Sequence, residues 1–414
     1  MPVNYGKLSN FTQLTEGNSI VRISKGSPNY KILQLKGMTI GIYESEHFET
    51  VYPVLRVLDN GTNHITIYTN ISVARQLKDQ LGADSQKFNW VLKEENQSLR
   101  SFIGVISEHV KQKSFDFFLL NTVSNNHLLF ARMIKNNPNT SFYLVVHDVN
   151  NLMLSKPGFG LRKLIRHIGK KMLVNNCKGF FAISSRTTNY LAGFINDGRT
   201  VQWFPGAIYE EAKPFSIKTE DVSTLKIVVP GTLDSRRRNY QQVFKLVEHV
   251  FGKQMAIEIC LLGGNSGMDS VALIEQCRQL SKRYKGFSFY DLPEVPFEEF
   301  DMQMRSADFI WVPSTVNTIM ADSIAETYGQ SKSSGNMFDA IRYAKPLLVP
   351  ASLTIDKEQE DAAIVYKDLE ELIEILSNLQ QSDKRAIWAG KALEVAKNYS
   401  VSKLQEKLVH YFTK

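Results

Sequence analysis

The feature that most constrains the fold of this chain is a regular alternation of short apolar runs with segments of helical periodicity. Such alternation is typical of a parallel sheet with helices on both faces. The expected strands cover Met38–Tyr43, Ile65–Thr69, Phe115–Asn121, Phe142–His147, Phe180–Ser184 and Val201–Phe204, and then Leu225–Val229, Ala256–Leu262, Phe287–Tyr290, Asp308–Val312 and Leu347–Val349. Because the pattern restarts near Leu225, we expect an α/β protein with two successive Rossmann-like halves.

The expected organisation follows from where this pattern begins, breaks and ends. Residues 1–37 are polar and turn-rich, with one expected strand near Ile20–Ile23, and are read as an N-terminal extension. The first Rossmann-like domain is expected over 38–205, a Pro- and Gly-containing linker over 206–224, and the second domain over 225–395. The tail is helical with a break near Asn398, and its last helix, 396–414, could cross back to the first domain. Ligands are expected in the cleft between the domains, at the carboxyl ends of the strands.

Composition excludes several classes of protein. The 414 residues are 43% hydrophobic and 22% charged, which is typical of a soluble globular protein, and no apolar run is long enough to span a bilayer. Residues 1–36 lack the apolar core of a secretory signal, so a cytoplasmic location is expected. Cys177, Cys260 and Cys277 do not form a CxxC pair, so neither a disulfide framework nor a structural zinc site is expected.

The net charge of +7 at pH 7 indicates an anionic partner. Nucleic acid, an anionic membrane and a phosphorylated substrate all fit this charge. The sequence contains neither an aromatic-rich ribonucleoprotein motif nor zinc-finger spacing, so we do not expect nucleic acid.

One stretch, 328–350, combines a small-residue loop, a helix and a buried strand. Ser334, a plausible N-cap, and Gly335 open the helix, with Asn336 beside them. Backbone N–H groups and the positive end of a helix dipole would meet there, which suits phosphate. Asp339, one turn into the helix, could accept hydrogen bonds from sugar hydroxyls. The same stretch also fits an ordinary loop, helix and strand of any α/β domain.

Glycines and arginines follow the strands of the second half. After Leu225–Val229, Gly231 allows a tight turn, and a run of three arginines follows: Arg236, Arg237 and Arg238. An arginine at this edge could hold a diphosphate, although a solvated charge run is the alternative, and only one or two of the three can face the site. Gly263, after the next strand, would let the backbone approach a ligand or would simply make a turn.

Two histidines stand at strand ends in the first half. His147 ends the very apolar run FYLVVHD, where a buried polar group needs a partner, either a ligand or a backbone carbonyl. His47 lies among Glu44, Glu46 and Glu49. It could act as a general base on a hydroxyl, or belong to a solvated acidic loop.

A basic amphipathic helix is expected from Leu161 to Met172. Its apolar positions recur at helical spacing, and basic residues cover the other side: Arg162, Lys163, Arg166, Lys170 and Lys171. Either its apolar side packs on the sheet and the basic side faces water, or the helix lies on an anionic membrane. We expect Leu161, Leu164 and Ile168 to pack inward.

The order of these motifs resembles GT-B glycosyltransferases, closest to the retaining group known as family 4. The resemblance covers most of the chain from about Met38. PGTLDSRRRNY is similar to the family's glycine turn with a basic residue on the donor diphosphate, at the position of Arg238. ETYG followed by SSGNMFDAIRYAKPLLVP resembles its acidic motif, with Glu326 as the first carboxylate and Asp339 as the one that holds the ribose. His147 aligns with a histidine that contacts the donor sugar.

The resemblance implies a metal-independent glycosyltransferase without a cofactor. A nucleotide-diphosphate sugar would be the co-substrate, and a glycan or a lipid-linked molecule the acceptor, with a possible role for the inner membrane surface. His147, Glu326 and His47 would be catalytic. Gly231, Arg237, Arg238, Gly263, Ser334, Gly335, Asn336 and Asp339 would bind the donor.

Two other functions remain open at this point. An epimerase acting on a nucleotide sugar would find carboxylates in Glu44, Glu46, Asp148 and Glu326. A non-catalytic subunit of glycosyltransferase type would fit the absence of glycine from the first loop, ESEHFET, and the SKSSG insertion before Asp339.

Overall fold

The computed structural model describes residues 37–211, 224–265, 270–319 and 324–412. The expected extension over 1–37, with its strand near Ile20–Ile23, lies outside these residues apart from Gly37. Most of the expected linker over 206–224 lies outside them as well.

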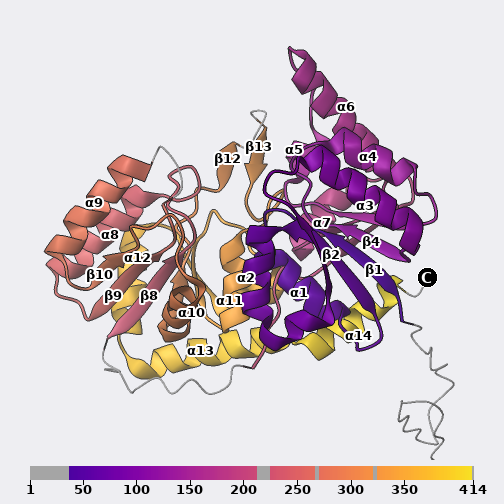
Figure 1. The fold of residues 1–414 in the computed structure, drawn as a ribbon. Coiled ribbons are helices and arrows are strands. Elements are labelled where there is room, and N and C mark those ends of the chain that lie inside the picture. Colours follow the sequence, from indigo (N-terminus) through magenta and orange to yellow (C-terminus); the bar gives the residue numbers. More distant parts are fainter. Residues whose placement is uncertain (1–36, 212–223, 266–269, 320–323, 413–414) are drawn as a thin grey trace, which may run out of the picture. The chain divides into compact units, whose positions relative to one another are not determined.

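Within the described residues, the first half forms a seven-stranded parallel sheet in the order β3-β2-β1-β4-β5-β6-β7 (Figure 1). Its strands are β1 (Thr39–Tyr43), β2 (His64–Asn70), β3 (Asn89–Lys93), β4 (Phe117–Leu120), β5 (Ser141–Val145), β6 (Gly179–Ala182) and β7 (Thr200–Trp203). The helices are α1 (Phe48–Leu58), α2 (Ile71–Leu81), α3 (Leu99–Lys113), α4 (His127–Lys135), α5 (Val149–Met153), α6 (Leu161–Asn176) and α7 (Ser185–Ala192), with a 3₁₀ turn η1 (Gly82–Lys87).

The second half repeats this topology in a six-stranded parallel sheet of the described residues, in the order β10-β9-β8-β11-β14-β15. Its strands are β8 (Leu225–Pro230), β9 (Ile257–Leu262), β10 (Phe287–Phe289), β11 (Phe309–Trp311), β14 (Leu347–Pro350) and β15 (Ala363–Tyr366). The helices are α8 (Tyr240–Gly252), α9 (Ser270–Arg283), α10 (Phe297–Ser306) and α11 (Gly335–Tyr343), with a 3₁₀ turn η3 (Lys357–Ala362).

Both sheets thus place their first strand beside their fourth, which is the strand order of the Rossmann fold. The order reverses between β1 and β4 and between β8 and β11, and ligands of such sheets bind outside these two points. The expected α/β class with two Rossmann-like halves is confirmed.

Four strands of the described residues were not predicted from the sequence pattern. β3 is partly exposed along its length, so its apolar residues do not form a continuous run. β15 is a four-residue edge strand next to β14. The hairpin of β12 (Asn317–Ile319) and β13 (Ala325–Thr327) is antiparallel and too short to show a periodicity.

The C-terminal segment is helical, as expected, and consists of α12 (Leu369–Leu379), α13 (Ser382–Lys397) and α14 (Val401–Phe412). Leu404 and Leu408 of α14 belong to the same apolar cluster as Leu55 of α1. The Gln405 side chain also donates a hydrogen bond to the backbone carbonyl of Val57, at 3.2 Å. The last helix is therefore packed against the first half of the chain.

Helix α6 departs from expectation. Leu161, Leu164 and Ile168 are exposed, whereas the opposite side of the helix is buried. Helical periodicity shows that a helix has an apolar side but does not show which side faces the protein, and here the expectation of inward packing is wrong. No helix among the described residues is long and apolar enough to cross a bilayer.

Candidate functional site

A cavity of about 290 Å³ lies at the carboxyl ends of the two sheets and takes its walls from both halves of the chain. It brings together most of the residues that sequence analysis singles out. These lining residues are His47, His147, Gly231, Arg237, Arg238, Ser334, Gly335, Asn336 and Asp339. Gly263 and Glu326 do not line it.

Arg238 wraps around the turn that follows β8. Gly231 has φ +100°, a conformation that glycine adopts without strain, and a Cβ there would lie 2.2 Å from Nη2 of Arg238. The Arg238 guanidinium donates hydrogen bonds to the carbonyls of Thr232 at 2.7 Å and Pro230 at 2.5 Å. The turn thereby holds the guanidinium at the cavity wall.

Two further contacts fix this turn. The buried Asn336 side chain donates a hydrogen bond to the carbonyl of Pro230 at 2.8 Å, which ties helix α11 to the end of β8. A Cβ on Gly263 would lie 2.0 Å from the carbonyl oxygen of Gly231. Gly263 therefore supports the turn from behind, and the backbone that it approaches is that of the protein itself.

Of the three consecutive arginines, only Arg237 and Arg238 line the cavity. The sequence predicts that one or two of the three face the site. Arg236 donates hydrogen bonds of 2.9 Å to Asp234 and does not line the cavity. Arg237 is half-exposed and lies 3.4 Å from the same carboxylate.

The amino-terminal end of α11 also opens on the cavity. Ser334 occupies the N-cap position, but its side chain makes no capping hydrogen bond. Among the residues that the structure describes, the backbone N–H groups of Gly335 and Asn336 have no hydrogen-bond acceptor. A Cβ built on Gly335 would meet nothing within 4 Å. The helix end therefore offers free donors and the positive end of its dipole to an anion.

Asp339 lies one turn further along α11 and lines the cavity. Its carboxylate has no hydrogen-bond partner among the described residues. Burial raises the pKa of Asp339 to about 6, with the nearby Arg342 opposing the rise. Hydrogen-bond donors on a ligand would stabilise the charged form of a buried carboxylate that has no such partner.

Two cations that sequence analysis missed complete this wall. Lys332 forms an ion pair with Asp148, on the other half of the chain. Arg342 donates to the backbone carbonyl of Glu49 at 3.2 Å, and its Nε is buried without a partner in the described part of the chain. Lys332 lies in the SKSSG insertion, and Arg342 lies on the same helix as Asp339. The sequence shows that both residues are charged but does not show that their side chains line the cavity.

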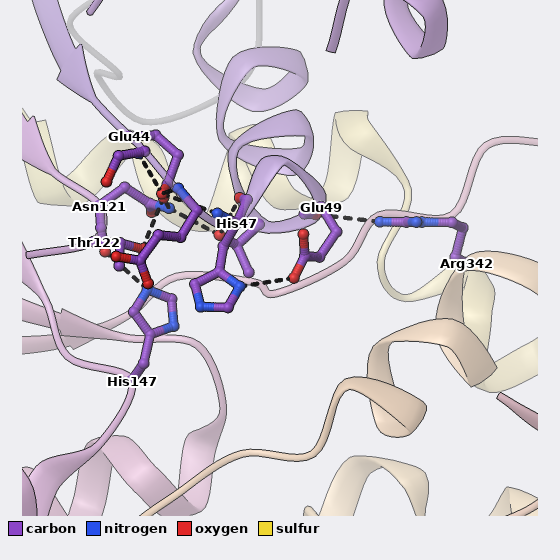
Figure 2. A network of polar contacts seen from close by, with 10 residues as sticks. Glu44, His47, Glu49, Asn121, Thr122, His147 and Arg342 are labelled. Carbon is purple, nitrogen blue, oxygen red and sulfur yellow. Dashed lines mark hydrogen bonds and ion pairs between the residues drawn. The ribbon is translucent and has the colours of Figure 1, made fainter. Parts of the chain in front are cut away.

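The first-sheet wall is organised around Glu44, which is fully buried (Figure 2). One carboxylate oxygen accepts the backbone N–H groups of Ser45, Glu46 and His47, at 2.6, 2.6 and 2.9 Å. The other accepts hydrogen bonds from the side chains of Asn121 at 2.5 Å and Thr122 at 2.8 Å. Sequence analysis proposed Glu44 only as an acid or base of an epimerase, whereas its bonds fix the β1–α1 loop.

The two histidines lie side by side with different protonation states. Their ring centroids are 5.4 Å apart. Burial opposes the charge on His47, but the hydrogen bond from its Nδ1 to Glu49 at 3.0 Å and the negative charges of Glu49, Glu44 and Glu46 together outweigh it. They raise the pKa of His47 to about 9. Burial lowers the pKa of His147, and the charge on His47 lowers it further. Near neutral pH, His47 is therefore a cation and His147 is neutral.

The hydrogen bonds of His147 also assign its tautomer (Figure 2). Its Nε2 lies 2.8 Å from the backbone carbonyl of Asn121, which can only accept, so Nε2 carries the proton. The Nδ1 atom is then an acceptor, without a hydrogen-bond partner in the described part of the chain.

Glu326 stands apart from the cavity. It is fully buried on β13, and its carboxylate accepts the backbone N–H groups of Asn151 at 2.7 Å and Asn150 at 3.4 Å. Burial raises the pKa of Glu326, against these hydrogen bonds. The carboxylate caps the first turn of α5 and joins the two halves of the chain, so its position does not support a catalytic role.

The lining of the cavity carries more positive than negative charge. Its lining includes the cations Arg237, Arg238, Lys332, Arg342 and protonated His47, against the carboxylates Glu49 and Asp339. Among the described residues there is no group of three or more His, Cys, Asp or Glu side chains that could hold a metal ion.

Neither the protein-family models nor the curated proteins contain a sequence match to this chain. Solved structures do match its fold. HepE of Anabaena in complex with UDP and glucose is 11% identical, with a TM-score of 0.58 over 91% of this chain and 99% of that one. The catalytic domain of starch synthase IV from Arabidopsis thaliana, bound to ADP and acarbose, is 11% identical, with a TM-score of 0.59 over 91% and 99%.

A third similar structure is the pneumococcal O-GlcNAc transferase GtfA in complex with UDP and GlcNAc. It is 9% identical, with a TM-score of 0.57 over 91% of this chain and 98% of that one. The two Rossmann-like sheets with a helical C-terminal segment are therefore the GT-B fold.

Proposed function

We propose that the protein transfers a sugar from a nucleotide-diphosphate sugar to a glycan or lipid-linked acceptor. The observation that carries this proposal is the cationic cavity at the free end of α11, beside the strand-order reversal of the second sheet. Two arginines, one lysine and unpaired backbone donors converge there, which is a set suited to a diphosphate. The similar structures with bound UDP or ADP support the proposal at the level of the fold.

The donor would lie mainly on the second half. Its diphosphate would accept hydrogen bonds from the N–H groups of Gly335 and Asn336 and from the guanidinium of Arg238. Asp339 would accept hydrogen bonds from the ribose hydroxyls, since its carboxylate has no partner among the described residues. This assignment agrees with the resemblance to family 4.

As the bond between sugar and diphosphate breaks, negative charge grows on the leaving phosphate. Fixed cations at that point stabilise the transition state more than the ground state. Arg238, Lys332 and the helix end would supply this charge, and we propose that transfer needs no metal. Activity that persists in the presence of a chelator would support this, and complete loss that Mg²⁺ restores would contradict it.

The first half would orient the sugar and admit the acceptor. Neutral His147 would accept a hydrogen bond from a sugar hydroxyl at Nδ1. His47 is a cation near neutral pH, so its role would be to attract the phosphate rather than to remove a proton. Glu326 would hold α5 in place.

Calorimetric titration with a panel of nucleoside diphosphates and their sugars tests the proposal. We expect binding of at least one nucleoside diphosphate and slow hydrolysis of its sugar in the absence of an acceptor. No binding of any panel member would contradict an active site and favour the non-catalytic subunit. Conversion of the nucleotide sugar to an isomer, without an acceptor, would identify an epimerase instead.

A further inference from the structure

Helix α6 turns an apolar side toward solvent. Leu161 is 73% exposed, and Leu164, Ile165 and Ile168 are between 41% and 44% exposed. Their spacing of three and four residues places them on one side of the helix. Phe159, just before the helix, is fully exposed. Together these five side chains form what is here called the α6 apolar face.

The opposite side of α6 holds the helix to the protein. Gly169 packs so tightly against α4 that a Cβ there would lie 2.7 Å from the backbone nitrogen of Leu128. Buried Lys170 donates hydrogen bonds to the backbone and side-chain oxygens of Asn151, at 2.8 and 2.9 Å. Because these contacts fix the rotation of the helix about its axis, the apolar face cannot turn inward without breaking them.

The surroundings of the apolar face are strongly basic. From Val149 to Asn196 the sequence contains no Asp or Glu. Exposed basic residues flank the face: Lys156, Arg162 and Lys171. An apolar face with a basic border and no carboxylates is the pattern of a helix that lies in the interface of an anionic bilayer.

We propose that α6 docks the protein on an anionic lipid surface, with Phe159, Leu161, Leu164, Ile165 and Ile168 entering the headgroup boundary. The charge distribution favours lipid over a second copy of the chain, because two such faces would set their basic borders against each other. A neutral lipid surface could bury the apolar residues but would not attract the basic residues that flank them. The proposal concerns a surface outside the cavity, so it stands whether or not the protein transfers sugar.

Flotation with phosphatidylglycerol and with phosphatidylcholine vesicles tests the docking. Wild-type protein should float with the first at low salt, lose most of this binding at high salt, and ignore the second. The double variant Leu161→Ser/Ile165→Ser should bind about a hundredfold more weakly, with roughly tenfold from each residue. Val271→Ser and Ile387→Ser remove similarly exposed apolar residues from α9 and α13 and should bind like wild type.

Charge is tested separately with Arg162→Gln/Lys171→Gln, which should weaken vesicle binding roughly twentyfold or more. Lys245→Gln on α8 is the matched control and should have no effect. The tryptophan of Leu164→Trp should shift to shorter emission wavelengths on phosphatidylglycerol vesicles, because the side chain leaves water.

Three results would overturn the proposal. One is equal binding to both kinds of vesicle, and another is binding to neither at low salt. The third is a dimer, seen by sedimentation without lipid, that the Leu161→Ser/Ile165→Ser variant abolishes. That result would show the α6 apolar face to be an interface between two copies.

Discussion

Two segments line the same cavity and differ in whether their backbone N–H groups have hydrogen-bond acceptors. In the β1–α1 loop, the buried Glu44 carboxylate accepts three successive N–H groups, so the loop is satisfied from within. At the start of α11, Ser334 does not cap, and the N–H groups of Gly335 and Asn336 have no acceptor among the described residues. A loop that carries its own anion serves as a fixed wall, and a helix end without one is available to a ligand.

The sharpest test of the first loop is removal of its carboxylate. Glu44→Ala should lower the free energy of unfolding by about 3–5 kcal/mol, because it leaves several buried donors unpaired. Nucleoside diphosphate affinity should change little in the protein that still folds. Chemical denaturation and calorimetry measure the two effects, with Glu46→Ala as an exposed control that should change stability by less than about 0.5 kcal/mol. A large loss of affinity without a loss of stability would mean that the first loop binds the ligand.

The cavity wall formed by the start of α11 and the turn after β8 should respond the other way to loss of a cation. Arg238→Ala should weaken nucleoside diphosphate binding by roughly 1.5–3 kcal/mol, or about tenfold or more, because a charge-assisted hydrogen bond is lost. Arg236→Ala removes a neighbouring arginine that does not line the cavity and should bind like wild type. If Arg237→Ala loses affinity and Arg238→Ala does not, the assignment of the diphosphate-binding arginine is wrong by one residue.

Asp339 provides a test through pH. Its pKa is higher in the folded chain, about 6, than its ordinary 3.8, so the folded state binds this proton more tightly. This favours folding at acidic pH, and the contribution is lost as pH rises through about 6. Asp339→Asn should therefore be more stable than wild type at pH 8, by on the order of 2 kcal/mol, and no more stable below about pH 4.

The same variant should bind nucleoside diphosphate roughly fivefold more weakly at pH 8, while pyrophosphate binding changes less, since the ribose contact is lost. Denaturation curves at several pH values and calorimetry with both ligands measure these effects. A change in stability with unchanged nucleoside affinity would make Asp339 a packing residue.

The smallest expected change in stability comes from a substitution at the free end of α11. Gly335→Asp places a carboxylate at the free helix end and should stabilise the fold by about 0.3–1 kcal/mol. It should also compete with the diphosphate and weaken its binding about tenfold. Ser382→Asp at the start of α13 is the control. It should increase the free energy of unfolding by a similar amount without weakening diphosphate binding. Equal affinities for wild type and Gly335→Asp would mean that α11 does not bind the anion.

Sequence alone predicts the parts of this molecule that depend on periodicity and on glycine. The apolar runs locate most strands, and Gly231 marks the turn that Arg238 wraps. The sequence cannot predict which side of a helix faces the protein. For this reason the expected inward packing of Leu161, Leu164 and Ile168 on α6 is wrong. Nor can the sequence predict the role of Glu44, because five hydrogen bonds to one carboxylate depend on the path of the backbone. The position of the Lys332 side chain depends on its ion pair with Asp148, which is distant in sequence. The sequence alone therefore does not predict that position.

The central claim is that the diphosphate of a nucleotide sugar binds at the free end of α11. A crystal structure of the complex with the nucleoside diphosphate that binds most tightly tests it most directly. We predict phosphate oxygens within hydrogen-bond distance of the N–H groups of Gly335 and Asn336 and of the Arg238 guanidinium, with the ribose on Asp339. Phosphates bound to the backbone N–H groups of the β1–α1 loop instead, or a nucleotide outside the cavity, would contradict the account.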